Sequence, residues 1–166
     1  MWGLLNLVYI DAEDSKKLSQ IAECSVKLGL KGYMGNKGGV CIRFEYLNTS
    51  FCVINCHLAA HKKNVKTRNE HVNAILKQAL FMLRKREVGV YEHDHVIWAG
   101  DFNYRLEGVP VENIHDGIIR KDYKRLLKFD QLNLLKKSGK ILFDFHEEQI
   151  CFQPTYKYQK GKQEYS

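Results

Sequence analysis

An apolar run that leads into two polar side chains occupies residues 95–103, which read His95-Val96-Ile97-Trp98-Ala99-Gly100-Asp101-Phe102-Asn103. The first five residues are short, apolar and β-favouring, which predicts a buried interior strand. The polar residues come where this strand ends, the usual place of functional sites in α/β folds. If the chain stays extended, its two-residue period turns Asp101 and Asn103 to the same side, so one cleft would hold a carboxylate and an amide. The alternative is a turn in which both side chains satisfy local backbone donors.

A second apolar run covers residues 51–54 and leads into Asn55, Cys56 and His57. Together with residues 38–46 it predicts a β-hairpin that turns at residues 47–50. Alternation divides the side chains between two faces, with Phe51, Val53, Asn55 and His57 on one and Cys52, Ile54, Cys56 and Leu58 on the other. The first face becomes polar toward the strand end, which favours a site residue at His57. The alternative is a core histidine whose hydrogen bonds are satisfied.

Helical periodicity appears twice along the chain. Apolar residues spaced by three and four predict an amphipathic helix over residues 64–86, and the pattern returns over residues 111–137, with a break near Asp130 and a stop at residues 138–139. Residues 22–30 fit either a strand or a helix. Residues 1–10 lack the basic leader and cleavage site of a signal peptide, so we predict a buried strand there. Strands that alternate with helices predict an α/β layered core in a single domain.

The chain carries 26 Lys and Arg against 19 Asp and Glu, a formal net charge of +7. This charge favours anionic partners, namely phosphoinositides, anionic membrane surfaces or nucleic acid. The basic residues gather in short clusters that we interpret as solvated helix faces: Lys62-Lys63, Lys66 with Arg68, residues 84–86, Lys121 with Lys124 and Arg125, and Lys136-Lys137. No run approaches the roughly 18 apolar residues that span a bilayer, so we expect membrane contact to be peripheral. The five cysteines have no Cys-x-x-Cys spacing, which indicates reduced core thiols in a cytoplasmic protein.

Two further segments have residues suited to phosphate binding. In Gly35-Asn36-Lys37-Gly38-Gly39 the glycines let the backbone approach an anion, and the lysine can meet a phosphate as a point charge. Near the other end of the chain, Pro154 stiffens the segment that leads to Tyr156 and Lys157. The alternatives are a plain glycine turn and a solvated loop lysine.

These four motifs, in this order, resemble those of the inositol polyphosphate 5-phosphatases, members of the endonuclease/exonuclease/phosphatase superfamily. The resemblance covers nearly the whole chain. It implies a four-layer α/β sandwich of the DNase I-like type, with residues 22–30 as a strand. It also implies Mg²⁺-dependent hydrolysis of the 5-phosphate of phosphoinositides or soluble inositol polyphosphates. The protein would be cytoplasmic and peripheral at anionic membrane surfaces, without a nucleic acid partner.

The resemblance also assigns roles to individual residues. Asp101 would orient or activate the attacking water near the metal, Asn103 would hydrogen-bond the scissile phosphate, and His57 would bind that phosphate as a candidate acid. The substrate contacts would be Asn36, Lys37, Tyr156 and Lys157, the last two toward a 4-phosphate. We therefore expect the three catalytic residues to open into a common cleft, with Lys37 and Lys157 nearer its rim.

Three motifs of the family are absent from these 166 residues: a metal-binding Glu on an upstream strand, Pro-x-Trp-Cys-Asp-Arg, and Ser-Asp-His. Gln159 also stands where the family usually has Asp after Tyr-Lys-Tyr. We therefore expect residues 1–166 to be part of a catalytic domain that is inactive alone, with Asp101 as a possible metal ligand. One alternative is a non-catalytic fragment that binds anionic headgroups. A nuclease of the same superfamily is another, disfavoured by the phosphatase motifs.

Overall fold

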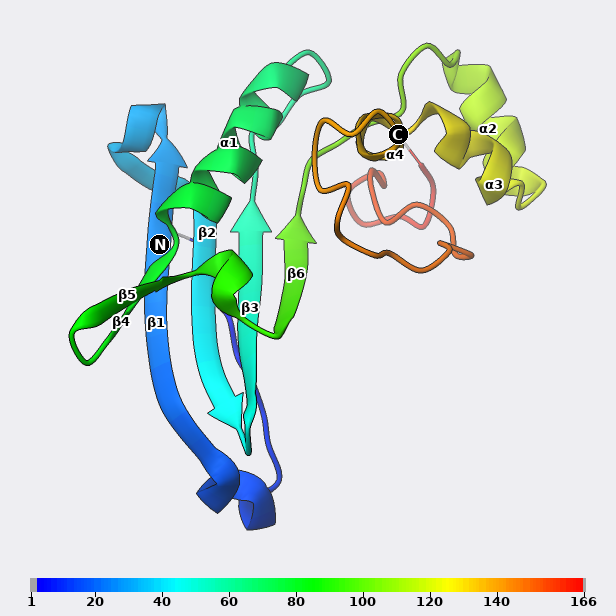
Figure 1. Ribbon diagram of the computed structural model, residues 1–166. Helices are drawn as coiled ribbons and strands as arrows, with labels where there is room; N and C mark the ends of the chain where they lie inside the picture. Colours follow the sequence, from blue (N-terminus) through cyan, green and yellow to red (C-terminus); the bar gives the residue numbers. More distant parts are fainter. Residues whose placement is uncertain (1–2, 166) are drawn as a thin grey trace. The chain divides into compact units, whose positions relative to one another are not determined.

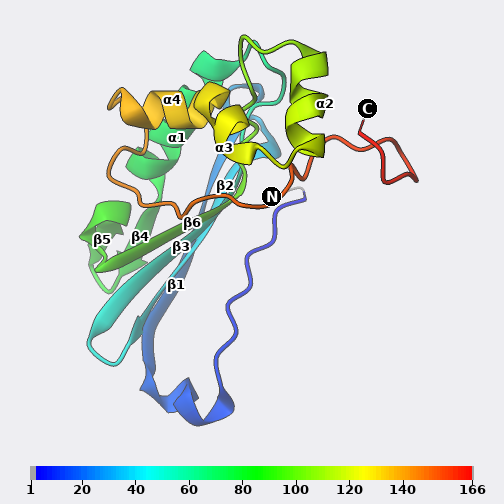
Figure 2. The same ribbon diagram turned by 90° about the vertical axis from the view of Figure 1, so that its right-hand side faces the viewer.

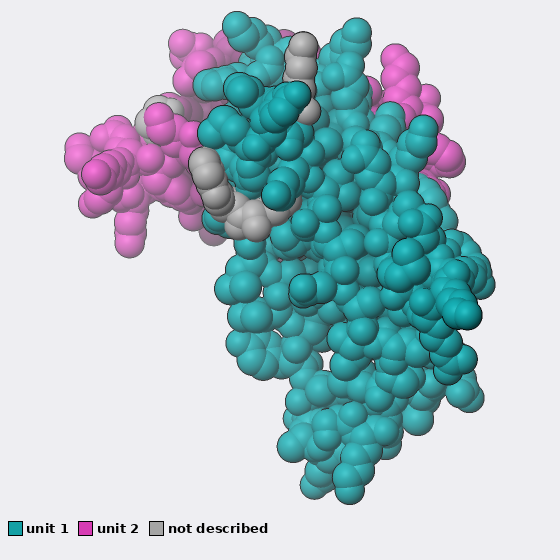
Figure 3. Space-filling view, turned by 90° about the vertical axis from the view of Figure 1, so that its left-hand side faces the viewer, with its two compact units in different colours: residues 1–103 teal, residues 104–166 magenta. Residues whose placement is uncertain are grey.

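The computed structural model describes residues 3–165, and the chain divides into two compact units between residues 103 and 104 (Figure 3). We describe each unit by itself. In this described part of the chain, the helices lack the length and apolar character needed to cross a bilayer. That the whole chain forms one partial domain stays a prediction.

The first unit is built on a mixed four-stranded sheet with the order β1-β2-β3-β6 (Figure 1). Its strands are β1 (Leu18–Gly29), β2 (Met34–Tyr46), β3 (Thr49–His57) and β6 (His95–Asp101). The first three pair antiparallel, whereas β3 and β6 are parallel. The predicted hairpin is confirmed with a tighter turn, because Tyr46 pairs with Thr49. The strand predicted over residues 22–30 is confirmed as far as Gly29, the last residue of β1, and this strand follows a 3-10 helix, η1 (Ala12–Lys17).

One face of this sheet is covered by helix α1 (Val65–Gln78) and by a small hairpin (Figures 1 and 2). The predicted alternation along β3 is confirmed, because Cys52, Ile54 and Cys56 are fully buried and their neighbours on the strand are not. On the helix, Val72 and Ile75 are fully buried as well. Burial of side chains this size stabilises the fold by about 1.5–3 kcal/mol each, so the apolar stripe of α1 explains its position on the sheet.

The helix is shorter than predicted. It ends at Gln78, and the chain continues as β4 (Leu80–Leu83) and β5 (Arg86–Gly89), so the prediction of a helix over residues 64–86 is wrong beyond residue 78. Ala79 and Phe81 are fully buried, while Leu80 and Met82 are 41% and 62% exposed. Side chains that alternate in this way fit the period of a strand.

The prediction of a buried strand over residues 1–10 is wrong for residues 3–10, and residues 1–2 lie outside the described part. This segment runs along the sheet face opposite α1 without joining a strand ladder (Figure 2). Its contacts to β3 come from two carboxamides: Asn6 Nδ2 donates to the Val53 carbonyl, and Asn55 Nδ2 donates to the Leu5 carbonyl. The attachment leaves apolar side chains exposed, among them Leu5 at 70% and Tyr9 at 86%.

The strand predicted over residues 95–99 exists, but it is not interior. Within residues 3–165, β6 is the last strand of the sheet and pairs with β3 alone. Val96 and Trp98 lie on the face that carries the core, whereas Ile97 turns to the other face and is 52% exposed. The apolar run therefore reflects one partly covered face rather than burial on both sides.

The second unit has helices within residues 111–137, as predicted. It contains α2 (Val111–Ile119), α3 (Tyr123–Leu126), a 3-10 turn η4 (Leu127–Phe129) and α4 (Gln131–Lys137). The break near Asp130 is confirmed, because its side chain accepts from the Asn133 N–H and caps α4. A second break, before α3, has the same cause, since Asp122 accepts from the Arg125 N–H. The predicted stop is also confirmed: Ser138 is the C-cap, and Gly139 follows with a φ of +69°.

Candidate active site

The ends of the parallel strands β3 and β6 bring two predicted catalytic residues together. His57 and Asp101 are register partners, and His57 Nε2 lies 3.4 Å from Asp101 Oδ2. The pairing continues past the strands, because the Leu58 N–H donates to the Asp101 carbonyl at 2.9 Å. The backbone ladder therefore holds both side chains at the carboxyl end of the sheet, and the prediction that they lie together is confirmed.

Gly100 makes this close approach possible. Its φ is +122°, and a Cβ on this residue would lie 2.2 Å from the Cys56 carbonyl oxygen and 2.5 Å from the Cys56 nitrogen. Any side chain here would push β6 away from β3. The residue before Asp101 thus sets how near the carboxylate comes to the imidazole.

Asn103 joins the same group of side chains through a turn rather than an extended strand. Its φ is +57°, so the extended conformation considered for residues 101–103 is not found, yet the two polar side chains do meet. Asn103 Nδ2 donates to Asp101 Oδ2 and to the Leu58 carbonyl, both at 3.1 Å, and its backbone N–H donates to Asp101 Oδ1 at 3.0 Å. Asp101 therefore satisfies a local backbone donor, as the alternative reading held, and is also fixed beside His57.

Lys37 lies within this group instead of at its rim, so the expected rim position is wrong. Its Nζ is in hydrogen-bonding contact with His57 Nε2, reached from β2, the strand next to β3. Burial and then the Lys37 ammonium lower the pKa of His57 below its ordinary value, while Asp101 opposes them. Burial also lowers the pKa of Lys37, and the negative charge of Asp101 opposes this shift. The cluster thus has a cation and a carboxylate that each contact a predominantly neutral imidazole.

Arg68 supports the loop that follows β3, and its interpretation as part of a solvated face is wrong. It is fully buried on α1, and its guanidinium donates to the carbonyls of Ala59, His61 and Lys62. Those carbonyls follow Leu58, which bonds both Asp101 and Asn103. The sequence held a signal for this role, because Arg68 is spaced by four from Val72 and so lies on the buried stripe of the helix.

The remaining predicted site residues are Asn36 in the first unit and Tyr156 and Lys157 in the second. The Asn36 side chain lies against β1, where its Oδ1 occupies the place that a Cβ on Gly29 would take. Tyr156 and Lys157 belong to residues 104–166, and both are exposed. Within that unit, the Arg105 guanidinium stacks on the Tyr156 ring at 4.7 Å, and the Pro154 carbonyl accepts from two tyrosine hydroxyls. Their roles in substrate binding stay predictions.

Asp101 is the residue of the cluster that suits a divalent metal. Its carboxylate is 60% exposed, and Mg²⁺ commonly binds one or two protein carboxylates together with water and phosphate oxygens. Among residues 3–165, no group of three or more His, Cys, Asp or Glu side chains gathers around one point. The described residues therefore fit a metal held by one carboxylate of this chain, with further oxygen ligands supplied by water and substrate.

Known proteins share this arrangement of sequence and structure. Residues 1–166 match the family model for endonuclease/exonuclease/phosphatase family 2. Human synaptojanin-2 is 46% identical over 148 residues, which cover 89% of this chain and 10% of that protein. The mouse type II inositol 1,4,5-trisphosphate 5-phosphatase is 36% identical over 166 residues, covering 98% of this chain and 17% of that protein.

A solved structure extends the comparison to the fold. The inositol polyphosphate 5-phosphatase domain of SPsynaptojanin, in complex with inositol (1,4)-bisphosphate and a calcium ion, has a TM-score of 0.84 and 34% identity. The match covers 93% of this chain and 44% of that one, so the chain spans under half of the solved domain and a smaller part of the relatives. The expected DNase I-like α/β sandwich is confirmed. The chain therefore belongs to endonuclease/exonuclease/phosphatase family 2, and it is similar in sequence and structure to members named as inositol polyphosphate 5-phosphatases.

Proposed function

We propose that the protein hydrolyses the 5-phosphate of phosphoinositides or inositol polyphosphates with Mg²⁺ as cofactor. The observation that carries this proposal is the contact of Lys37, His57 and Asp101 at the ends of three adjacent strands. Phosphoryl transfer depends on charged and polar groups fixed around one phosphate, and this cluster provides them from rigid elements. The family relatives support the choice of substrate, since their names give phosphoinositide or inositol phosphate 5-phosphatases.

Lys37 and His57 would contact the substrate phosphate in sequence. While Lys37 is charged, its ammonium can only donate, so His57 Nε2 accepts and the imidazole proton is on Nδ1. A phosphate oxygen is a stronger acceptor for an ammonium than imidazole is, so substrate would draw Lys37 away and free Nε2 to contact the phosphate. Mg²⁺, when bound, would polarise the phosphoryl group and offset its developing charge.

Asp101 and Asn103 have distinct parts in this proposal. Asp101 would bind the metal or orient the attacking water, since its carboxylate faces the same region as His57 Nε2. Asn103 donates both of its amide hydrogens to protein oxygens, so its first effect is to fix Asp101. A direct bond from Asn103 to the scissile phosphate would require one of these hydrogen bonds to open.

Phosphate release by the full-length protein tests the proposal. With Mg²⁺ and either a 4,5-bisphosphorylated inositol lipid or soluble inositol trisphosphate, we expect turnover that Asp101→Asn lowers by at least about a hundredfold. Asp11→Asn is the matched control. Asp11 is exposed and lies just before η1 and the start of β1, whose Leu18 pairs with Tyr46 at the end of β2 away from His57. Binding of either substrate without Mg²⁺-dependent turnover would support the headgroup-binding alternative. The inactivity of residues 1–166 alone stays a prediction, which the same assay checks.

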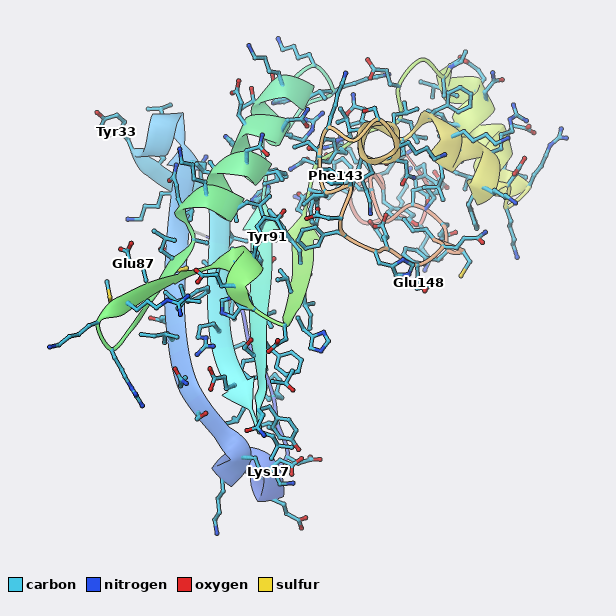
Figure 4. The ribbon with its side chains drawn as sticks, viewed as in Figure 1. Lys17, Tyr33, Glu87, Tyr91, Phe143 and Glu148 are labelled. Carbon is cyan, nitrogen blue, oxygen red and sulfur yellow. The ribbon has the colours of Figure 1, made fainter. Side chains whose placement is uncertain are left out.

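We also propose peripheral binding to anionic membranes through the turn between β1 and β2. This turn, η2 (Leu30–Gly32), precedes the segment that carries Lys37. Leu30 in the turn is 72% exposed, and Tyr33, which follows the turn and is labelled in Figure 4, is 88% exposed. Apolar and aromatic side chains on a positively charged protein favour the membrane interface. Such a contact would bring the catalytic strand ends toward lipid headgroups.

Vesicle co-sedimentation tests this membrane contact. Leu30→Ser should lower binding to vesicles that contain anionic lipid by several fold. Leu47→Ser is a close control, because Leu47 is also exposed and also has a positive φ, but lies in the turn at the opposite end of β2. Equal losses in the two variants would contradict the proposal. A cytoplasmic location is part of the same proposal, supported by five free thiols, and cell fractionation checks it.

A further inference from the structure

Two cysteines face each other across the strand pair β1–β2. Cys24 and Cys41 are direct register partners. Direct partners in an antiparallel pair have Cα atoms about 4.5 to 5.5 Å apart, and both values fall inside the range of about 4.4 to 6.8 Å found for disulfides. Cross-strand partners also point to the same face of the sheet. A small approach of the two sulfur atoms would therefore suffice for a bond between them.

Other cysteines on this sheet are less favourably placed for Cys41. Its direct partner on β3 is Ile54, so Cys52 and Cys56 lie diagonal to it. Diagonal neighbours have Cα separations of about 7–8 Å, beyond the disulfide range. Among the sheet cysteines in the described residues, Cys24 is thus the one directly opposite Cys41.

The two thiols differ in exposure and in acidity. Cys24 is half-buried, whereas Cys41 is 1% exposed. A hydrogen bond from the Cys41 thiol lowers the pKa of Cys24, and the same interaction, with burial, raises the pKa of Cys41. The thiolate is the reactive form of cysteine, so the accessible member of the pair is also the more reactive one.

We propose that Cys24 and Cys41 form a modification site at which a hydroperoxide produces a reversible disulfide. The Cys24 thiolate attacks one peroxide oxygen and breaks the O–O bond, which leaves a sulfenic acid on Cys24 and, with hydrogen peroxide as oxidant, releases one water after proton uptake. The Cys41 sulfur then attacks the Cys24 sulfur, and the sulfenic hydroxyl leaves with the Cys41 proton as a second water. Two thiols lose two electrons, and the peroxide gains them.

The bond would join β1 to β2 around residues 25–40, which include the turn η2, Asn36 and Lys37. Closing this ring restricts the unfolded chain, so the oxidised protein should have a melting temperature higher by about 5 °C. The inference does not depend on the proposed function, because it rests on the strand register and on the exposure of the two thiols.

Peptide mapping of the full-length protein tests the site. The protein is treated with hydrogen peroxide at low concentration, the remaining thiols are alkylated, and the unreduced digest is analysed by mass spectrometry. We expect a peptide that links Cys24 to Cys41 and disappears on reduction with dithiothreitol. Cys24→Ser should abolish it, whereas Cys151→Ser, a change at an exposed cysteine of the second unit, should leave it intact.

Peptide mapping of the protein without substitutions tests the proposed Cys24–Cys41 link even if a variant folds poorly. A link from Cys24 to Cys52 or Cys56 would overturn the proposal. Overoxidation of Cys24 to sulfinic acid, with Cys41 still alkylated after denaturation, would overturn it as well. If the melting temperature is unchanged in protein whose Cys24–Cys41 link is complete, the predicted stabilisation by the disulfide is wrong.

Discussion

Replacing Gly100 by Ala should destabilise the fold far more than a single methyl group would suggest. The new Cβ would lie 2.2 Å from the Cys56 carbonyl oxygen and 2.6 Å from Asn55 Oδ1, so backbone atoms must move. Overpacking of this kind costs roughly 1–3 kcal/mol, and the positive φ adds about 1–2 kcal/mol. We therefore expect the free energy of unfolding to fall by about 2–5 kcal/mol, with β6 displaced beside Asp101.

Gly39→Ala provides the comparison. Gly39 lies on β2 with an ordinary φ, and a Cβ there would meet side-chain atoms of Ile75 at 3.2 Å, which can shift by a few tenths of an ångström. Its cost should stay within about 1 kcal/mol, because Ala also gains strand stability relative to Gly. Urea unfolding followed by the fluorescence of Trp98, two residues before Gly100, measures both variants. A Gly100→Ala variant as stable as Gly39→Ala would refute the reasoning.

Three further predictions concern the supports and contacts of the site. Arg68→Lys should lower the free energy of unfolding by about 2–3 kcal/mol, because a lysine cannot bond three carbonyls at once, whereas Arg84→Lys at an exposed turn should be neutral in the same urea assay. The free energy of unfolding should decrease as the pH falls below about 6.5, because burial lowers the pKa of His71 in the folded state, so the unfolded chain takes up the proton first. In melting curves recorded at several pH values, His71→Gln should make the melting temperature depend less on pH. In the full-length enzyme, Lys157→Ala should raise KM for substrates with a 4-phosphate and leave kcat nearly unchanged, and an equal loss for substrates without that phosphate would contradict its assigned role.

The strands over residues 38–58 and 95–99 could be predicted because their apolar runs are short and rich in β-favouring residues, which fits a strand better than a helix. Residues 79–83 could not, since their apolar residues fit a helical spacing and a strand spacing equally well. Ala79, Leu80 and Leu83 continue the helical stripe, while Ala79, Phe81 and Leu83 alternate. Burial of Phe81 against the rest of the first unit favours the strand, and this burial cannot be seen in the sequence alone.

Some features of the candidate site could also be predicted from the sequence, whereas others could not. The family resemblance predicted that Asp101 and His57 meet, because it gives both residues roles at one phosphate, and the parallel register of β3 and β6 places them together. The conformation of Asn103 and the inward position of Lys37 depend on contacts with Leu58 and His57, so they appear only in three dimensions. Arg68 was misread because arginine usually remains in solvent, and its place on the buried stripe was the signal against that default.

The parallel pairing of β3 with β6 has a consequence for the order in which the site forms in time. Lys37 meets His57 within a local hairpin, but Asp101 reaches His57 only after the chain has passed through α1, β4 and β5. Contacts between distant residues require more loop-closure entropy and form more slowly. We expect β2 and β3 to gain protection before β6 in pulsed hydrogen exchange during refolding, and simultaneous protection would contradict this order. Lys37 and His57 would then be in contact before Asp101 joins them and the three side chains form the site.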